Sequence, residues 1–280
     1  FGSHWLGRCM PEGDSAYRVA ANLDRALRGG VVTRLEIRTG EADTLPLVGQ
    51  EVRGVEAFGK HVMIRVGDYS IHSHMLMDGF WHIYRPGARW RRPGHEARVV
   101  VATEKAEAVG FLVAQVKLIR TRDEERLTGH LGPDPLKVGW DQGGKERAAT
   151  NLAGDPRPLH VALLDQRNVA GFGNEYVNEI CFLLGIHPGT PASLTDTVRV
   201  LDLGTRLIRA NRDRVRRTTT GNTRAGKQKH VYGRAGKPCT RCGSLIRRTG
   251  LGAAAGQERV VYYCPTCQPP RRPERRAQTP

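Results

Sequence analysis

Apolar residues follow two different spacings in the first half of the chain. Tyr17, Ala20, Leu23 and Leu27 recur at helical spacing and predict a helix over Asp14–Leu27. Short stretches rich in Val, Ile and aromatic residues follow and are separated by Gly, Asp and Pro, which is typical of strands. Strands without intervening helices predict an antiparallel sandwich or barrel. We place them at Val31–Arg38, Val62–Val66, Ser70–His74, Phe80–Tyr84, Ala97–Ala102 and Gly110–Ile119.

Helical spacing returns in the second half of the chain. It is preceded by a stretch rich in Gly, Pro, Asp and Lys at 129–158, which we expect to be an interdomain linker. Helices are predicted at His160–Gln166, Glu175–Leu184 and Asp196–Arg217. The fold class is therefore α+β, with an antiparallel sandwich and flanking helices followed by a helical part.

Composition excludes several classes of protein. The chain has 280 residues, of which 39% are hydrophobic and 26% charged, so it can bury a core. No apolar run reaches the roughly 18 residues of a membrane helix, and no signal-peptide pattern is present. Six cysteines are too few for a disulfide scaffold, so we expect a reducing, intracellular compartment. The sequence gives no sign of an oligomer interface, and we expect a monomer.

The positive charge is concentrated at the carboxyl end. Residues 1–205 hold 25 Lys and Arg and 25 Asp and Glu, whereas residues 206–280 hold 19 Lys and Arg and three acids. The formal net charge of +16 therefore lies in the last 75 residues. Such a block indicates nucleic acid or an acidic membrane surface as a partner. A solvated basic tail explains the arginines at 271–276 but not those around the cysteines.

Four cysteines form two paired motifs. Cys239 and Cys242 are separated by two residues, as are Cys264 and Cys267, with 21 residues between the pairs. Four thiolates in this pattern suit one structural zinc ion, because they leave no position for water or substrate. The alternatives are a redox pair or free thiols. The intervening residues predict a hairpin of Ser244–Arg248 and Arg259–Tyr263, which suits DNA binding or, alternatively, protein binding.

A glycine-containing turn lies between two predicted helices. It reads Gln-Arg-Asn-Val-Ala-Gly-Phe-Gly-Asn-Glu-Tyr from Gln166 to Tyr176. Backbone N–H groups in such a turn can hold a phosphate, and Asn174 can cap the next helix or donate to that phosphate. By itself the motif has low specificity. It is not a dinucleotide fingerprint, because no strand precedes it.

Together these motifs resemble the bacterial formamidopyrimidine-DNA glycosylase/endonuclease VIII family. The resemblance extends from Met10 to Gln268. It is carried by Met-Pro-Glu-Gly at 10–13, Gly-Lys-His at 59–61, Leu-Gly-Pro-Asp-Pro-Leu at 131–136, the turn motif ending at Asn174, Val-Tyr-Gly-Arg at 231–234, the four cysteines and Arg259.

The resemblance implies a domain plan. It comprises an extension at 1–9, a catalytic β-sandwich at 10–135, a linker at 136–158 and a helix–two-turn–helix DNA-binding domain at 159–221. A zinc finger at 231–268 and a disordered tail at 269–280 complete it. Damaged double-stranded DNA would lie between the domains, and the enzyme would work in the bacterial cytoplasm without a membrane.

The resemblance also implies a chemistry. Pro11, as an amino terminus, would attack C1′ of the damaged nucleotide and form an imine. Glu12 would transfer protons as a general acid and base. The imine would permit β- and then δ-elimination at the abasic site. Lys60, Asn174 and Arg259 would bind the phosphates around the lesion, with Lys60 and Arg259 part of the catalytic machinery, and Arg234 would contact DNA.

The damaged base must leave the stack before C1′ becomes accessible. Met77 matches the family's wedge position, where an apolar side chain fills the gap between base steps. A core methionine is the alternative interpretation of this residue.

Two departures from the family pattern matter. Residues 1–9 would make the nitrogen of Pro11 an amide, which forms no imine, so we expect the working protein to begin at Pro11. The arginine-phenylalanine wedge motif of the 8-oxoguanine enzymes is missing near Gln115–Lys117, and only 11 residues separate Thr220 from Tyr232. Both features favour the endonuclease VIII branch of the family, and with it oxidised pyrimidines as substrates.

Three alternatives remain open at this point. The chain could be an 8-oxoguanine-preferring glycosylase, a non-catalytic zinc-dependent protein that binds damaged DNA, or a zinc-ribbon adaptor for other proteins. The adaptor leaves the motifs of residues 10–136 unexplained.

Overall fold

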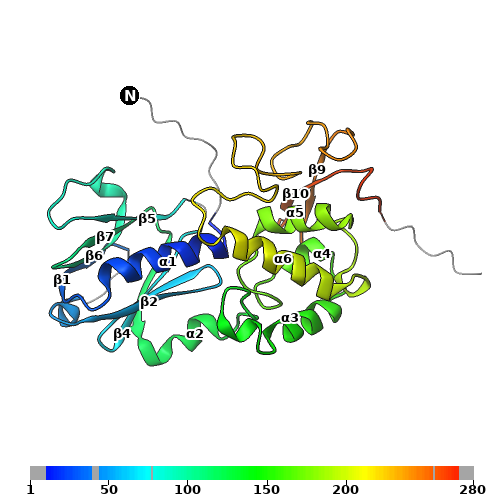
Figure 1. Ribbon diagram of the computed structural model, residues 1–280. Coiled ribbons are helices and arrows are strands. Elements are labelled where there is room, and N and C mark those ends of the chain that lie inside the picture. Colours follow the sequence, from blue (N-terminus) through cyan, green and yellow to red (C-terminus); the bar gives the residue numbers. More distant parts are fainter. Residues whose placement is uncertain (1–10, 40–43, 77, 255, 271–280) are drawn as a thin grey trace, which may run out of the picture.

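A strand-rich half and a helical half lie side by side along the long axis of the molecule (Figure 1). The computed structural model describes residues 11–39, 44–76, 78–254 and 256–270. Met10, the extension 1–9, the expected wedge Met77 and residues 271–280 lie outside the described residues.

The first half consists of helix α1 (Gly13–Leu27) and two four-stranded antiparallel sheets. One sheet has the order β1-β6-β7-β5 and the other the order β2-β3-β4-β8. The strands of the first sheet are β1 (Val32–Ile37), β6 (Ala97–Thr103), β7 (Glu107–Phe111) and β5 (Phe80–Tyr84). Those of the second are β2 (Val52–Phe58), β3 (His61–Val66), β4 (Tyr69–His74) and β8 (Gln115–Arg120).

One apolar core joins α1 to both sheets. Leu23 and Leu27 on α1 are completely buried, as are Ile64 in β3 and Val101 in β6. Burying each such side chain contributes about 1.5–3 kcal/mol to folding. The predicted antiparallel sandwich with a flanking helix is thereby confirmed.

Two strand predictions were wrong. The expected strand Gly110–Ile119 is divided between β7 and β8, which belong to different sheets. The chain changes direction at Leu112, which has a positive φ of 52°, and no glycine or proline marks this point in the sequence. Strand β2 was not expected, because charged residues and Gly54 interrupt its apolar pattern.

The second half packs four described helices around another core. They are α3 (Gly144–Ala153), α4 (Leu159–Leu164), α5 (Asn174–Leu184) and α6 (Thr197–Asn211). The short helix α2 (Glu125–Thr128) precedes them in the sequence and has no buried residue. Short 3₁₀ turns occur in both halves of the molecule. They lie at Leu45–Leu47, Gly94–Glu96, Thr121–Asp123, Val138–Trp140 and Ala192–Leu194. Trp140, Phe172 and Tyr176 are the largest buried side chains of this core.

The helical half corrects two further expectations. Residues 136–158 are not merely a linker, because they include α3, whose Ala148 and Leu152 are buried in the second core. Helix α6 ends at Asn211 and not at Arg217. The Asn211 side chain accepts a hydrogen bond from the N–H of Thr218 and donates to its carbonyl, which brings the chain back toward α1.

The last segment forms a hairpin of β9 (Arg247–Leu251) and β10 (Arg259–Tyr263). A small core of Phe182, Val231, Ile246 and two of the cysteines holds it against α5. The buried side chain of Gln268 donates to the carbonyl of Ile186 and accepts from the N–H of Cys264, which fixes the end of the segment. Among the described helices, none has both the length and the apolar character needed to cross a bilayer.

Candidate active site at the junction of the two halves

Glu12 joins the two halves of the molecule. Its side chain is buried, and its carboxylate accepts hydrogen bonds from the N–H groups of Gly173 (3.0 Å) and Glu175 (2.9 Å). Both amides belong to the start of α5, where N–H groups have no partner within the helix. A Cβ at position 173 would lie 2.5 Å from the carboxyl carbon of Glu12, so this position requires glycine.

The start of α1 is fixed to the same turn. The N–H of Gly13 donates to the carbonyl of Gly171 at 2.8 Å, and a Cβ at position 13 would lie 2.9 Å from the Cα of Gly171. Pro11, half-buried, directly precedes Glu12. The structure therefore places Pro11 where the two halves meet.

Arg217 is the buried counter-charge of this junction. Its guanidinium donates to Asp14 in a two-pronged pair (2.8 and 2.5 Å) and lies 3.6 Å from Glu12 and 3.4 Å from Glu175. Lys229 adds a second positive charge at 2.7 Å from Glu175. Three buried carboxylates thus share two cations, as buried charges require.

The charges of this cluster shift the pKa values of Glu12 and Lys60, two of the residues predicted to form the site. Burial raises the pKa of Glu12, and the charges of Arg217 and Lys60 partly offset that rise. Burial lowers the pKa of the Lys60 amine, with Glu12 acting against the shift and Arg217 and Arg259 adding to it. Glu12 therefore keeps its proton to a higher pH than an exposed glutamate.

Lys60 lies in the turn between β2 and β3. Gly59 has a positive φ of 56°, which favours glycine, and its N–H donates to the buried carboxylate of Asp134 at 2.7 Å. A Cβ at position 59 would meet the Cβ of Ala170 at 3.2 Å. The β2–β3 turn is thereby held against the glycine turn of the helical half, with Lys60 beside Glu12.

Asn174 begins α5 and links it to the hairpin. Its side-chain oxygen lies 2.8 Å from Nε2 of His160, and its amide donates to the carbonyl of Val260 at 2.8 Å. Asn178, one turn later, accepts from the N–H of Tyr262. The exposed Arg259, next to Val260, is thus positioned by α5.

Glu179 organises the segment that follows α6. Its buried carboxylate accepts from the N–H groups of His230, Val231 and Tyr232, each at 2.8 Å, and from the hydroxyl of Thr219. The guanidinium of Arg234 donates to the carbonyls of Lys229, His230 and Pro238. Arg234, expected to contact DNA, is therefore engaged in holding its own loop.

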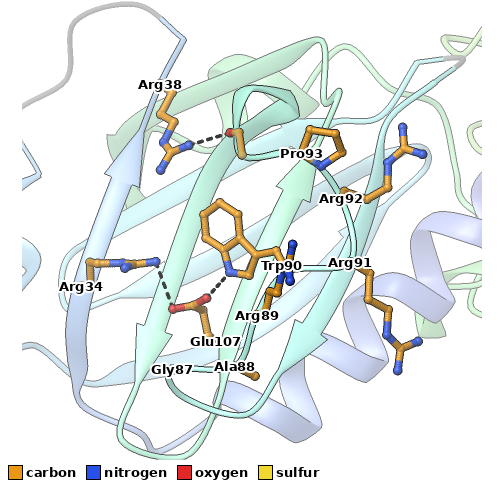
Figure 2. Close-up of a pocket in the computed structure, with 11 residues that line it drawn as sticks. Arg34, Arg38, Gly87, Ala88, Arg89, Trp90, Arg91, Arg92, Pro93 and Glu107 are labelled. Atoms are coloured by element: carbon orange, nitrogen blue, oxygen red, sulfur yellow. Dashed lines mark hydrogen bonds and ion pairs between the residues drawn. The ribbon is translucent and has the colours of Figure 1, made fainter.

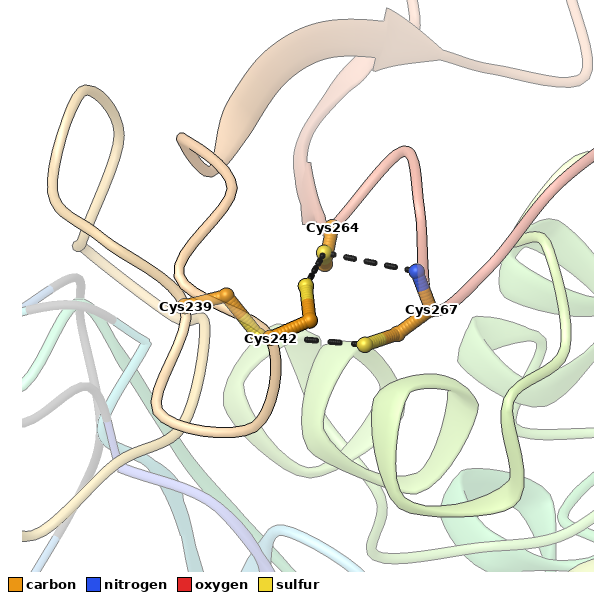
Figure 3. Close-up of side chains that lie close together, drawn as sticks. All are labelled: Cys239, Cys242, Cys264 and Cys267. Atoms are coloured by element: carbon orange, nitrogen blue, oxygen red, sulfur yellow. Dashed lines mark hydrogen bonds between the residues drawn. The ribbon is translucent and has the colours of Figure 1, made fainter.

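The four cysteines form a cluster at the base of the hairpin (Figure 3). All their sulfur atoms lie within 4.8 Å of one another. The N–H groups of Arg241 and Cys267 each point at a cysteine sulfur, at 3.4 Å, as in thiolate metal sites. The donor set fits one metal ion bound by four thiolates.

Sequence reasoning missed the buried charges of the junction. Glu175, Glu179, Arg217 and Lys229 were not singled out, and Asp14 was considered only at the start of the first helix. Glu175 and Glu179 lie four residues apart in a helix that holds no other charged residue, which was an available signal. No local signal marked Arg217, because its partner Asp14 is 203 residues away in the sequence.

Comparison with known proteins agrees with this geometry. Residues 10–128 match the formamidopyrimidine-DNA glycosylase N-terminal domain, and residues 131–218 match the formamidopyrimidine-DNA glycosylase H2TH domain. "Probable endonuclease 8 2" of Streptomyces coelicolor is 45% identical, over 92% of this chain and 94% of that protein. "DNA-(apurinic or apyrimidinic site) lyase Nei2" of Mycolicibacterium smegmatis is 43% identical, over 92% of this chain and 99% of that protein.

A solved structure shares the fold. Lactococcus lactis formamidopyrimidine-DNA glycosylase, non-covalently bound to DNA with an abasic site, superposes with a TM-score of 0.74 at 22% identity. The match covers 92% of this chain and 99% of that one. The fold and the junction site define a helix–two-turn–helix DNA glycosylase class. The chain belongs to the formamidopyrimidine-DNA glycosylase family, in its endonuclease VIII-like branch.

Proposed function

We propose that this chain is a bifunctional DNA glycosylase and abasic-site lyase of base-excision repair. It excises oxidised bases, pyrimidines in preference, with the secondary amine of Pro11 as nucleophile. The anchoring of Glu12 on the amides of Gly173 and Glu175 carries the proposal, because it fixes the adjacent Pro11 at the junction of the two halves.

The nucleophile requires a free nitrogen at Pro11. A terminal amine has a pKa near 8, so a useful fraction is neutral at pH 7. It attacks C1′ of the damaged nucleotide while the bond from C1′ to the base breaks and the base takes up a proton. After the amine has lost its proton, the bond from C1′ to the ring oxygen breaks and that oxygen takes up a proton. The product is a covalent iminium ion, the protonated imine, on the opened sugar. An amide at this position has no basic lone pair, so the working form is proposed to start at Pro11.

Glu12 supplies and removes protons around this step. Its raised pKa lets a fraction of the side chain stay protonated and donate to the departing base or to the ring oxygen of the sugar. The imine acidifies the C2′ proton, so its removal expels the 3′ phosphate in β-elimination. A second elimination expels the 5′ phosphate and leaves a one-nucleotide gap.

The DNA backbone is held by Lys60, Asn174 and Arg259. Arg259 lies close enough to Lys60 for its positive charge to lower the pKa of the Lys60 amine. Asn174 positions the strand that carries Arg259. Arg234 contributes by holding residues 229–238. Met77 is proposed as the wedge that fills the place of the flipped base. Damaged duplex DNA is the partner, bound by a monomer in the bacterial cytoplasm.

The four cysteines are proposed to hold one zinc ion. Zinc there has a structural role, because four thiolates complete its tetrahedral shell. It keeps the hairpin folded, and with it the position of Arg259. No step of the reaction passes through the metal.

An incision assay tests this function. Protein that starts at Met10, from which the methionine is removed, is given duplexes with one oxidised pyrimidine, one 8-oxoguanine or one abasic site. The proposal predicts incision at the pyrimidine and abasic sites, with phosphate on both new ends, and slower release of 8-oxoguanine. Faster release of 8-oxoguanine would favour the purine-specific alternative. Tight binding without incision would favour a non-catalytic DNA-binding protein.

A further inference from the structure

Strand β5 lies at the edge of its sheet. It pairs with β7 on one side, and no other described strand pairs with its second edge, which faces α1. The N–H and C=O groups along such an edge can pair with an added strand. Strand β5 is also distant in sequence from the glycine turn of residues 166–176.

A groove of about 580 Å³ runs between this edge and α1. We call it the β5 groove. Its floor is apolar, with Leu23 and Val19 on α1 facing Trp81 and Ile83 on β5, and 41% of Ile83 is exposed. The indole N–H of Trp81 is buried and has no hydrogen-bond partner among the described residues.

An arginine-rich segment borders the groove. Residues 85–92 read Arg-Pro-Gly-Ala-Arg-Trp-Arg-Arg. Residues 87–92 line a second hollow of about 690 Å³, which shares Arg91 with the β5 groove (Figure 2). Trp90 fixes this segment on the sheet, because its ring packs on Phe111 and its N–H donates to Glu107.

Several of these arginines remain available to a ligand. Arg92 is paired with Glu96 and Arg34 with Glu107. In contrast, Arg85, Arg89 and Arg91 are exposed, and none of them forms an ion pair with a described residue. Arg25 adds a further exposed cation on the α1 side of the groove. The rim is therefore positive, although residues 1–205 as a whole carry no net charge.

We propose that the β5 groove binds an extended acidic peptide segment of a partner protein, which adds to β5 as a further strand. Side chains of an added strand alternate between the two faces of the sheet. Those on the face of Trp81 and Ile83 enter the apolar groove, and those on the other face meet the arginine-rich segment. The peptide that fits best therefore alternates apolar and acidic residues.

The groove suits a peptide better than duplex DNA. Its floor is apolar and walled by a helix and a strand, so it accepts single side chains, whereas a duplex presents a convex row of phosphates. The free edge of β5 offers backbone hydrogen bonds that match a peptide and do not match a sugar-phosphate chain.

A synthetic peptide tests this proposal. The probe is fluorescein-labelled Asp-Val-Asp-Val-Asp-Val-Asp, and its control carries lysine in place of each aspartate. We expect saturable binding of the acidic probe by fluorescence anisotropy and none of the lysine control. Hydrogen exchange of the β5 amides should slow when the probe is bound, which a merely electrostatic contact with the arginines would not cause.

Matched variants locate the binding site. Ile83→Glu places a negative charge in the groove and should weaken binding at least about tenfold, whereas Val48→Glu, at a similarly exposed valine outside the groove, should not. Arg91→Ala should weaken binding, and Arg122→Ala should not. Abasic-site cleavage by Ile83→Glu should equal that of the unaltered chain, which shows that it folds.

Three outcomes would overturn the proposal. They are no saturable binding of the acidic probe, equal binding by Ile83→Glu, and unchanged exchange of the β5 amides. Competition of the probe by undamaged duplex DNA, lost in Arg91→Ala, would show that the segment is a DNA contact and would likewise overturn it.

Discussion

The carboxylate of Glu12 accepts a hydrogen bond from the backbone N–H of Glu175 at 2.9 Å, across the junction of the two halves. The residue that follows the proposed nucleophile therefore also accepts from the first amides of α5, the helix that follows the glycine turn. Positioning of Pro11 and assembly of the two halves depend on the same side chain.

The Glu12→Gln variant tests both roles of this side chain, in stability and in base excision. Glutamine keeps the shape but turns an NH₂ group toward one of the two backbone donors, so stability should fall by about 1–3 kcal/mol in urea unfolding. Base excision should be lost, because no proton donor remains. The exposed Glu258→Gln is the control and should change neither quantity. Unaltered excision in Glu12→Gln would show that this carboxyl is not the proton donor.

Arg217→Met tests the buried charge cluster. It leaves the carboxylates of Asp14, Glu12 and Glu175 together with less positive charge, and removal of one partner of a buried pair costs about 3–5 kcal/mol. The pKa of Arg217 is held above its usual value by these carboxylates despite burial, so the loss should persist at neutral pH. Urea unfolding of this variant and of the exposed Arg216→Met measures the difference. Equal stability of the two variants would show that Arg217 does not stabilise the buried carboxylates.

Acid should destabilise the contact between α4 and α5. Burial lowers the pKa of His160 to about 4, from 6.5 in an exposed histidine. Nε2 of His160 donates to Asn174, so the neutral ring suffices for this contact. The unfolded chain takes up the proton first, so the contribution of His160 to stability is complete above pH 6.5 and is lost as pH falls through 4, by about 3 kcal/mol at the limit.

Unfolding free energies measured between pH 7 and 4 check this prediction. His160→Gln should reduce the slope of stability against pH in this window, while the exposed His95→Gln should not. The same slope in His160→Gln and the unaltered chain would show that the ring is not buried in its neutral form.

Removal of the metal should weaken DNA binding through Arg259. The hairpin has only a small core of its own, so a chelator should unfold it and release Arg259. The slope of log affinity against log salt should then fall by about 0.9 for each lost phosphate contact. Arg259→Ala should reproduce part of this change without loss of the metal. An unchanged salt slope after chelation would show that the hairpin does not contact the backbone.

The sequence predicted the local features better than the long-range ones. Apart from β2, the described strands were predicted, as were the helices α1 and α5 and the cysteine cluster, because apolar spacing and cysteine spacing are local signals. The division between β7 and β8 was missed because only the positive φ of Leu112 marks it. Helix α3 was missed because its apolar face is short and glycines and charged residues surround it.

The candidate site shows the same limit. The family motifs identified Pro11, Glu12, Lys60, Asn174 and Arg259. They did not show that Arg217 returns to Asp14, or that Asn174 is bonded to both His160 and Val260, because these contacts join residues 14 to 203 positions apart. The roles of all these residues, that of Met77 and the preferred lesion stay predictions.

Borohydride trapping on a duplex with one abasic site tests the role of Pro11 most directly. Reduction of an imine fixes the protein to the DNA, and mass spectrometry of the digested adduct identifies the attached residue. Protein started at Met10 should form the adduct through Pro11, whereas the 280-residue chain, with Pro11 as an amide, and the Pro11→Gly variant with one added residue before it should not. An adduct at another residue, or none from protein with a free Pro11 that still binds the duplex tightly, would contradict the account.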